Sequence, residues 1–241
     1  QRHPHLVHVR LVGFPSASER LAYDVVVQAE TGFMHMNGPA EAPPTRMPVA
    51  LMDILASQQI LSAVYEGLLE RAAGHSGIFA EVSLEASGLS ALANQATNWL
   101  INGADITRNG SAHPNIAPYG DLLKCIDGWL VLAVGNDRQF AGLCDVLECA
   151  ELIEDSRFQT NALRVKHRND LVPLLSEQTQ PWNKIPLEEA LRAAGVPAGV
   201  VRRLPEVFAP DTFGNQHTQQ NKSGQKREKT VAYRMEFLAE S

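Results

Sequence analysis

The sequence predicts an α/β protein, in which a layer of strands and helices joined by crossovers precedes a smaller α+β unit. A β-rich run opens the first half, and a long helical pattern with an alternating strand pattern behind it follows. Strand, helix, strand and helix in close succession is typical of an α/β layer. In the second half two short strand patterns stand before three helical ones, which indicates a smaller α+β unit.

The first predicted element is a strand at Leu6–Phe14, which is rich in Val and Leu and is closed by glycine and proline. A loop at residues 16–19 follows it. Residues 22–36 have apolar spacing for a helical turn or two, stopped by a glycine. The proline-rich stretch 39–48 is incompatible with regular structure, so we expect it to deliver the chain in an extended form to Asp53.

A helix of about five turns is predicted from Ile54 onward, because apolar residues recur at intervals of three and four residues. Gly74 is expected to end it. Residues 78–84 alternate as a strand, and residues 85–102 predict a second helix rich in Ala and Leu. The polar connection 103–120 is long for a compact protein, so we expect the junction between two domains there.

The smaller unit is predicted to begin with two short strands around the hairpin dipeptide Asp127-Gly128. Helical patterns follow at residues 137–147, 168–178 and 187–194. After Pro210 large apolar residues become rare, so we expect that stretch to be exposed or poorly ordered, with one further short element at residues 231–238. The predicted domains are therefore 1–105, 106–209 and a polar tail, 210–241.

Composition excludes several classes of function. With a formal net charge of -6 the chain has no basic field for nucleic acid or an anionic membrane surface. No apolar run reaches the roughly 18 residues of a membrane helix, so we expect a soluble, cytoplasmic protein. The three cysteines, Cys125, Cys144 and Cys149, have no CxxC spacing and lie in apolar runs. We interpret them as reduced thiols that pack as small hydrophobes.

Asp53 is the candidate for chemistry, because it stands between an apolar run and the long predicted helix. One interpretation makes it the N-cap, whose carboxylate accepts from backbone N–H groups of the first turn. In the other it is a nucleophile, which the positive end of the helix keeps ionised. The two roles are compatible, and the residues alone leave both open.

Several segments that keep their order resemble the family III coenzyme A transferases, the CaiB/BaiF group. They are VHVRLVGF, YDVVVQAETGFM, VALMD with its helix and GHSGIFAEVSLEA, GSAHPNIAPYG, DGWLVLAVGNDRQF, DSRFQTNALRVKHRNDL and AAGVPAGVVRRLPEVF. The resemblance implies a Rossmann-like large domain and a small domain in each subunit of an interlocked homodimer. On the same resemblance we expect this chain to carry only part of the large domain, without the family's N-terminal segment.

The resemblance also assigns site residues. It implies that Asp53 is the nucleophile and that coenzyme A lies along a segment of four residues, Leu21, Ala22, Tyr23 and Asp24. The alternative for Tyr23 and Asp24 is an exposed helix start, in which Asp24 is a first-turn acid. The resemblance further implies a loop over the active site that includes Asn109, Gly110, Ser111 and His113. Backbone N–H groups of that loop can stabilise an oxyanion, although the same residues suit an ordinary turn. His113 is either a general base or a structural hydrogen-bonding group.

Two further groups of side chains, one basic and one of histidines, could bind a ligand or could have no binding role. Four basic residues can bind an acidic substrate or phosphates, yet charge runs are usually solvated: Arg108, Arg164, Lys166 and Arg168. The histidines His3, His5 and His8 lack zinc-site spacing with further ligands, so no metal is expected.

The resemblance implies transfer of coenzyme A from an acyl-CoA to a carboxylic acid, through anhydride and thioester intermediates on Asp53. Two alternatives stay open. The first is an acyl-CoA racemase of the same family, which needs a histidine and an aspartate to move the α-proton. The second is a catalytically incomplete fragment that retains the dimer scaffold.

Overall fold

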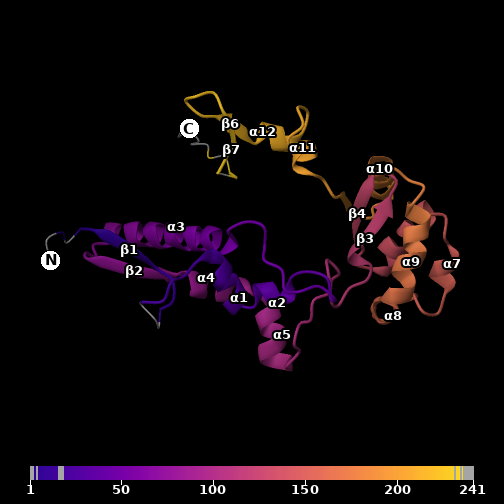
Figure 1. Cartoon of the computed structure of the whole chain (residues 1–241), viewed down its shortest axis with the longest axis horizontal. Helices are drawn as coiled ribbons and strands as arrows, with labels where there is room; N and C mark the ends of the chain where they lie inside the picture. The colour runs from indigo at the N-terminus through magenta and orange to yellow at the C-terminus, as the bar shows by residue number, and fades with distance from the viewer. Residues whose placement is uncertain (1–2, 4, 16–18, 231, 234, 236–241) are drawn as a thin grey trace. The chain divides into compact units, whose positions relative to one another are not determined.

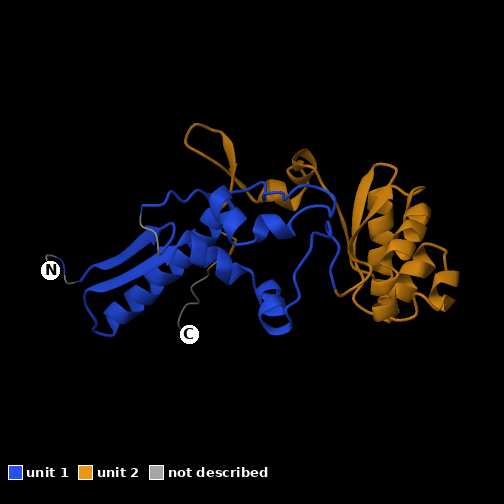
Figure 2. Cartoon of the chain, turned by 60° about the horizontal axis from the view of Figure 1, so that its bottom comes forward, with its two compact units in different colours: residues 1–114 blue, residues 115–241 orange. Residues whose placement is uncertain are grey.

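The computed structural model describes residues 3, 5–15, 19–230, 232, 233 and 235. The chain divides into two compact units, residues 1–114 and 115–241 (Figure 2). Their boundary falls within the polar connection 103–120. The loop predicted after the first strand and the element predicted near the C-terminus lie largely outside the described residues.

Unit 1 is built on two parallel strands, β1 (Val7–Val12) and β2 (Ile78–Ser83). Parallel neighbours need a crossover, and the long helix α3 (Leu51–Ala72) lies along both strands (Figure 1). Gly67 permits the close approach, because a Cβ atom there would stand 2.5 Å from Val7 Cγ1. The predicted strand–helix–strand order is confirmed.

The two ends of α3 differ in how well the sequence predicts them. The helix begins at Leu51, three residues before the predicted start at Ile54. At the other end Gly74 has a φ of +100°, which suits glycine, and its N–H donates to the Arg71 carbonyl. The His75 N–H donates to the Glu70 carbonyl, which completes a Schellman motif.

Two short helices precede the extended stretch, α1 (Asp24–Glu30) and α2 (Phe33–Met36). The intervening Gly32 has a φ of +87°, so the predicted break at this glycine is confirmed.

The single helix predicted at residues 85–102 is wrong, because the structure contains two helices, α4 (Leu84–Ala91) and α5 (Asn94–Asn102). The chain breaks at Ala93, whose φ is +48°. Ala and Leu are strong helix formers, so no local signal marks this break.

The core of unit 1 lies at the start of α3, where α1, α3 and α4 meet. Its buried side chains are Phe14, Val27, Met52, Ala56 and Leu84. Helix α4 comes close because its residue 88 is glycine: a Cβ atom there would be 2.8 Å from the Met52 sulfur. The first turn of α3 is therefore fixed from several sides.

Unit 2 contains an antiparallel sheet in the order β3-β4-β5, with strands at Tyr119–Cys125, Gly128–Ala133 and Ala198–Val200. Its helices are α6 (Asp137–Val146), α7 (Glu151–Glu154), α8 (Asn161–Lys166), α9 (Arg168–Thr179) and α10 (Lys184–Ala193). The predicted hairpin and the three predicted helices are confirmed, and so is the mixed α/β class. The short elements β5, α7 and α8 were not predicted. Interlocking of two subunits stays a prediction.

The three cysteines lie in the buried core of unit 2, and none of them forms a disulfide. This burial agrees with the interpretation of these thiols as small hydrophobes.

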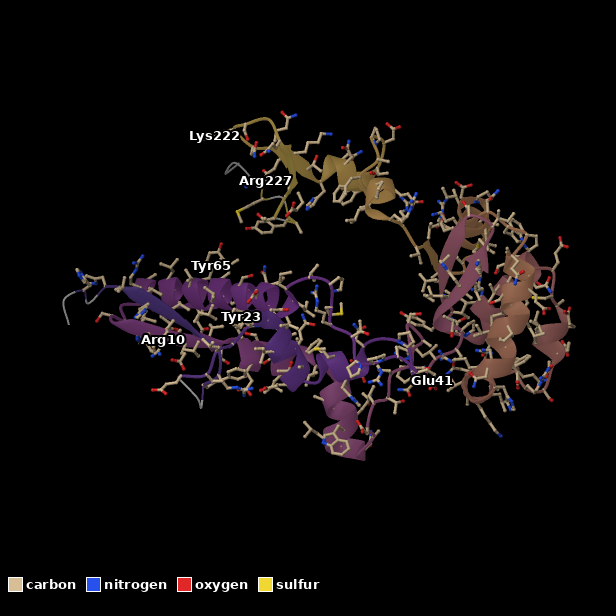
Figure 3. The ribbon with its side chains drawn as sticks, in the orientation of Figure 1. Arg10, Tyr23, Glu41, Tyr65, Lys222 and Arg227 are labelled. Atoms are coloured by element: carbon tan, nitrogen blue, oxygen red, sulfur yellow. The ribbon has the colours of Figure 1, made fainter. Side chains whose placement is uncertain are left out.

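The last described stretch carries more regular structure than its composition indicates. It contains α11 (Leu204–Val207), α12 (Phe213–Gln216) and a hairpin of β6 (Thr218–Gln220) and β7 (Lys226–Glu228). Lys222 and Arg227 lie on this hairpin (Figure 3). Strand β7 is exposed, in agreement with the predicted exposure of the tail.

Candidate functional site

Asp53 is the third residue of α3, and its side chain is exposed. The N-cap position belongs to Ala50, which has no side-chain oxygen to offer. The N-cap interpretation of Asp53 is therefore wrong, because the helix starts before it. Within the described parts of the chain, no hydrogen bond of the Asp53 carboxylate is found.

Asp24 supplies the cap instead. Its Oδ1 accepts a hydrogen bond of 2.7 Å from the Met52 N–H, although the two residues are 28 positions apart. The first N–H groups of a helix have no partner within the helix, so an outside carboxylate stabilises this end. Asp24 is the first residue of α1, and thus one short helix holds the start of another.

Gln28 holds Asp24 in turn. Its Nε2 donates to Asp24 Oδ2 over 2.6 Å, and its Oε1 accepts from the Met47 N–H over 2.8 Å. The side chain is completely buried. Gln28 was not predicted as a site residue. The signal was available, because residues four apart on a helix share a face and Gln28 follows Asp24 at that spacing.

The other residues of the expected coenzyme A segment lie directly before α1. Leu21 and Tyr23 are 75% and 66% exposed, so both side chains are open to contact with a ligand. Tyr23 is labelled in Figure 3. Ala22 is half-buried and packs closely against Gly13. A Cβ atom added at Gly13 would stand 2.1 Å from the Cβ of Ala22. The structure therefore joins this segment to the start of α3 through Asp24.

A polar hollow of about 420 Å³ opens at the carboxyl end of β1. Its lining includes the charged side chains of Arg10, Arg20 and Glu81 together with Gly13 and Phe14. Ligands of open α/β sheets bind at the carboxyl ends of strands. Along the chain this hollow immediately precedes the expected coenzyme A segment.

The loop at residues 109–113 is anchored to the end of α2. The Gly110 N–H donates to the Gly38 carbonyl over 3.1 Å, and Arg108 donates to the His35 carbonyl. The Ala112 N–H donates to the Asn109 carbonyl, which closes a turn. Both N–H groups are thus occupied and cannot serve as oxyanion donors here.

Two backbone N–H groups of this loop, those of Asn109 and Ser111, make no hydrogen bond to any described residue. Asn109, Gly110 and Ser111 are exposed, whereas His113 is half-buried. No hydrogen bond or ion pair joins His113 to Asp53, both of which the structure describes. The role of His113 therefore stays a prediction.

Two of the basic residues have neither predicted role. Arg164 is completely buried and donates to the carbonyls of Ala117 and Phe158 and to Asp137. Arg168 forms an ion pair with Asp121. Burial raises the pKa of Asp121, although the nearby guanidinium of Arg168 acts in the opposite direction. The expectation of a solvated or substrate-binding charge run is wrong for both, because their charges hold the structure together. Only Lys166 of the four is exposed.

No group of three or more His, Cys, Asp or Glu side chains suited to a metal ion exists among the residues that the structure describes. In the same part of the chain, no helix has the length and apolar character needed to cross a membrane.

The chain matches the family model described as CoA-transferase family III over residues 1–239. It is 35% identical over 209 residues to a succinate–glutarate CoA-transferase of Agrobacterium fabrum, which covers 86% of this chain and 52% of that protein. It is 34% identical over 214 residues to the human succinyl-CoA:glutarate CoA-transferase, covering 86% and 48%. The chain thus spans about half the length of the curated relatives it matches.

A solved structure gives the same result at the level of the fold. The crystal structure of a CaiB/BaiF family protein from Brucella suis superimposes with a TM-score of 0.83 at 34% identity. The similarity covers 95% of this chain and 62% of that one.

Proposed function

Because the chain belongs to CoA-transferase family III, we propose that it transfers coenzyme A from an acyl-CoA thioester to a carboxylic acid, with Asp53 as the nucleophile. One observation carries the assignment of Asp53. Its carboxylate is exposed in the first turn of α3, while Asp24 takes over the capping. A carboxylate in this position is stabilised by the helix dipole and remains available for chemistry.

The first half of the reaction replaces an acyl thioester by an enzyme thioester. The Asp53 carboxylate attacks the thioester carbonyl, the C–S bond breaks, and coenzyme A leaves as a thiolate from a mixed anhydride. The thiolate then attacks the Asp53 carbonyl and expels the first carboxylate. Both steps form a tetrahedral oxyanion, which backbone N–H donors stabilise.

The second half repeats the chemistry with the acceptor. The incoming carboxylate attacks the Asp53 thioester and releases the thiolate, which leaves a second anhydride. The thiolate then attacks the acceptor's carbonyl, so that the new acyl-CoA departs and the Asp53 carboxylate is restored. No redox or metal chemistry is needed for this balance.

For the substrate we propose an acyl-CoA whose pantetheine chain lies along the exposed side chains of Leu21 and Tyr23. Their exposure supports this placement, because pantetheine is an amphipathic chain that needs apolar contact. The two relatives are named as CoA-transferases for succinate and glutarate, which supports a dicarboxylate as the acceptor of coenzyme A.

We also propose a homodimer. Helix α3 is covered by the strands on one side and exposes a second apolar stripe of Ile54, Leu61, Tyr65 and Leu68. A helix that is apolar on both sides is usually covered on both. Light scattering of the full chain tests this: a mass of one chain at micromolar concentration contradicts the dimer.

The transferase assignment is tested by detecting a covalent coenzyme A adduct on Asp53. The full chain is mixed with succinyl-CoA, digested with trypsin, and the peptide Met47–Arg71 is examined for a coenzyme A adduct. We expect the adduct on Asp53 in the natural chain and none in the Asp53→Ala or Asp53→Asn variants. Exchange of labelled succinate into succinyl-CoA should be lost in the same variants.

The contrary outcome is equally clear. Label exchange that persists in folded Asp53→Ala rules out Asp53 as the nucleophile. If the natural chain gives neither an adduct nor exchange, the incomplete fragment replaces the enzyme as the better description.

A further inference from the structure

We propose that Gln28 is a positioning residue for Asp53. Its side chain bonds to residues 47–49, which lead into α3, and to the Asp24 carboxylate, which caps the first turn of α3. The inference rests on the proposed function and adds to it a residue that has no assigned role. Gln28 does not touch the reacting atoms. It acts through Asp24 and through residues 47–49.

The geometry uses both ends of the Gln28 amide. Nε2 donates to Asp24 Oδ2 over 2.6 Å and lies 3.4 Å from the Val49 carbonyl, while Oε1 accepts from the Met47 N–H over 2.8 Å. A reversed amide would set NH₂ against the Met47 N–H and oxygen against a carboxylate. The partners therefore fix one orientation, and a completely buried side chain leaves no water to replace them.

This lock matters because α3 has no cap of its own. Residue 50 is alanine, and the N–H of Met52 depends on Asp24. The stretch that enters the helix is rich in proline and makes few bonds of its own, so Gln28 ties it to α1 at Met47. If these bonds are lost, the first turn can fray, and Asp53 is its third residue.

Small displacements of a nucleophile have large kinetic effects. A shift of about 1 Å lowers a rate by about a hundredfold, since attack needs a defined distance and angle. Loss of the Gln28 bonds should therefore slow formation of the Asp53 adduct much more than it weakens binding of coenzyme A.

Two substitutions separate positioning from simple stability. Gln28→Leu keeps the volume and removes all bonds. Gln28→Glu keeps the acceptor for the Met47 N–H, but it donates to Asp24 only when one proton is shared between the two carboxyl groups. Such paired carboxylates take up a proton at a higher pH than isolated ones. The glutamate variant should therefore recover as the pH is lowered.

The experiment measures the rate of adduct formation on Asp53 with succinyl-CoA in the full chain, from about pH 8 to about pH 5. We expect Gln28→Leu to be slower by about tenfold to a hundredfold at every pH. Gln28→Glu should be equally slow at high pH and should approach the natural chain at low pH. The controls Gln59→Leu and Gln59→Glu, at an exposed position of α3 outside its apolar stripe, should match the natural chain.

Amide hydrogen exchange of residues 47–54 is measured in the same variants, because it reports the lock without any reaction. Faster exchange there in Gln28→Leu, but not in the Gln59 variants, supports the inference even if the natural chain forms no adduct and the proposed function fails. An adduct rate in Gln28→Leu equal to that of the natural chain overturns the inference and leaves the proposed function intact. So does a Gln28→Glu variant whose adduct rate and amide exchange, each taken relative to the natural chain at the same pH, do not change with pH.

Discussion

The Nε of Arg164 donates a hydrogen bond of 2.9 Å to the carbonyl of Ala117, from a side chain that has no exposed surface. The guanidinium also lies over the Phe140 ring, 4.5 Å from its centroid. Arg164 and Ala117 are 47 positions apart, so this bond ties helix α8 to the chain that enters β3. A positive charge thereby serves as an internal support of unit 2.

Arg164→Met should destabilise the protein by about 3 kcal/mol, because two buried carbonyls lose their donor and one carboxylate loses its partner. Chemical denaturation measures the free energy of unfolding. The matched control is Arg192→Met, since that side chain is 70% exposed and pairs with Glu188 on the surface. Its cost should be about 0.5 kcal/mol or less. Equal costs for the two variants would contradict the buried role of Arg164.

Gly67→Ala should destabilise the protein by about 1 kcal/mol, although alanine favours a helix interior by about that amount. The added Cβ would stand 2.5 Å from Val7 Cγ1, and a β-branched side chain cannot easily turn away. The double variant with Val7→Ala provides the check. In that background the same glycine substitution should become neutral or stabilising, and an unchanged cost would exclude the contact as its cause.

The ion pair of Lys184 and Glu206 should make stability depend on pH in the acid range. Its Nζ–Oε1 distance is 2.6 Å, and the hydrogen bonds that Lys184 and Arg203 donate lower the pKa of Glu206 from 4.5 to about 2. Because the native pKa is the lower one, the stabilisation is complete above pH 4.5 and is lost as the pH falls toward 2.

The free energy of unfolding of the natural chain should therefore exceed that of Glu206→Gln at pH 6, and the difference should shrink toward pH 2. In a Lys184→Met background the difference should be smaller, because only the bonds from Arg203 to Glu206 remain. A difference that stays constant with pH would show that the charge of Glu206 is not what matters.

The thiols of Cys144 and Cys149 should be unreactive in the native protein. The hydrogen bond between these two side chains and their burial raise the pKa of Cys144, so its thiolate is scarce. All three cysteines should react with a thiol reagent such as DTNB only at the rate of unfolding. Rapid reaction of Cys149 under native conditions would show that the core of unit 2 opens locally.

The elements with local signals are visible in the sequence. The spacing of apolar residues predicts α3, the alternation at residues 78–84 predicts β2, and a glycine marks the end of α3 at Gly74. The order of several motifs also indicates the family, and that resemblance makes Asp53 the candidate nucleophile. The helix, strand and glycine signals depend on neighbours within one or two turns or strand steps, and such neighbours are visible in a linear sequence.

Only the tertiary structure decided which residues hold the start of α3, where the candidate Asp53 lies. Asp24 caps a helix 28 positions away, and Gln28 bonds to a residue 19 positions away. The burial of Arg164 and the break at Ala93 likewise have no local signal. A hydrogen bond between distant segments depends on how the segments pack. For this reason the sequence indicates Asp53 as the candidate nucleophile, whereas the bonds that hold the first turn of α3 are visible only in the fold.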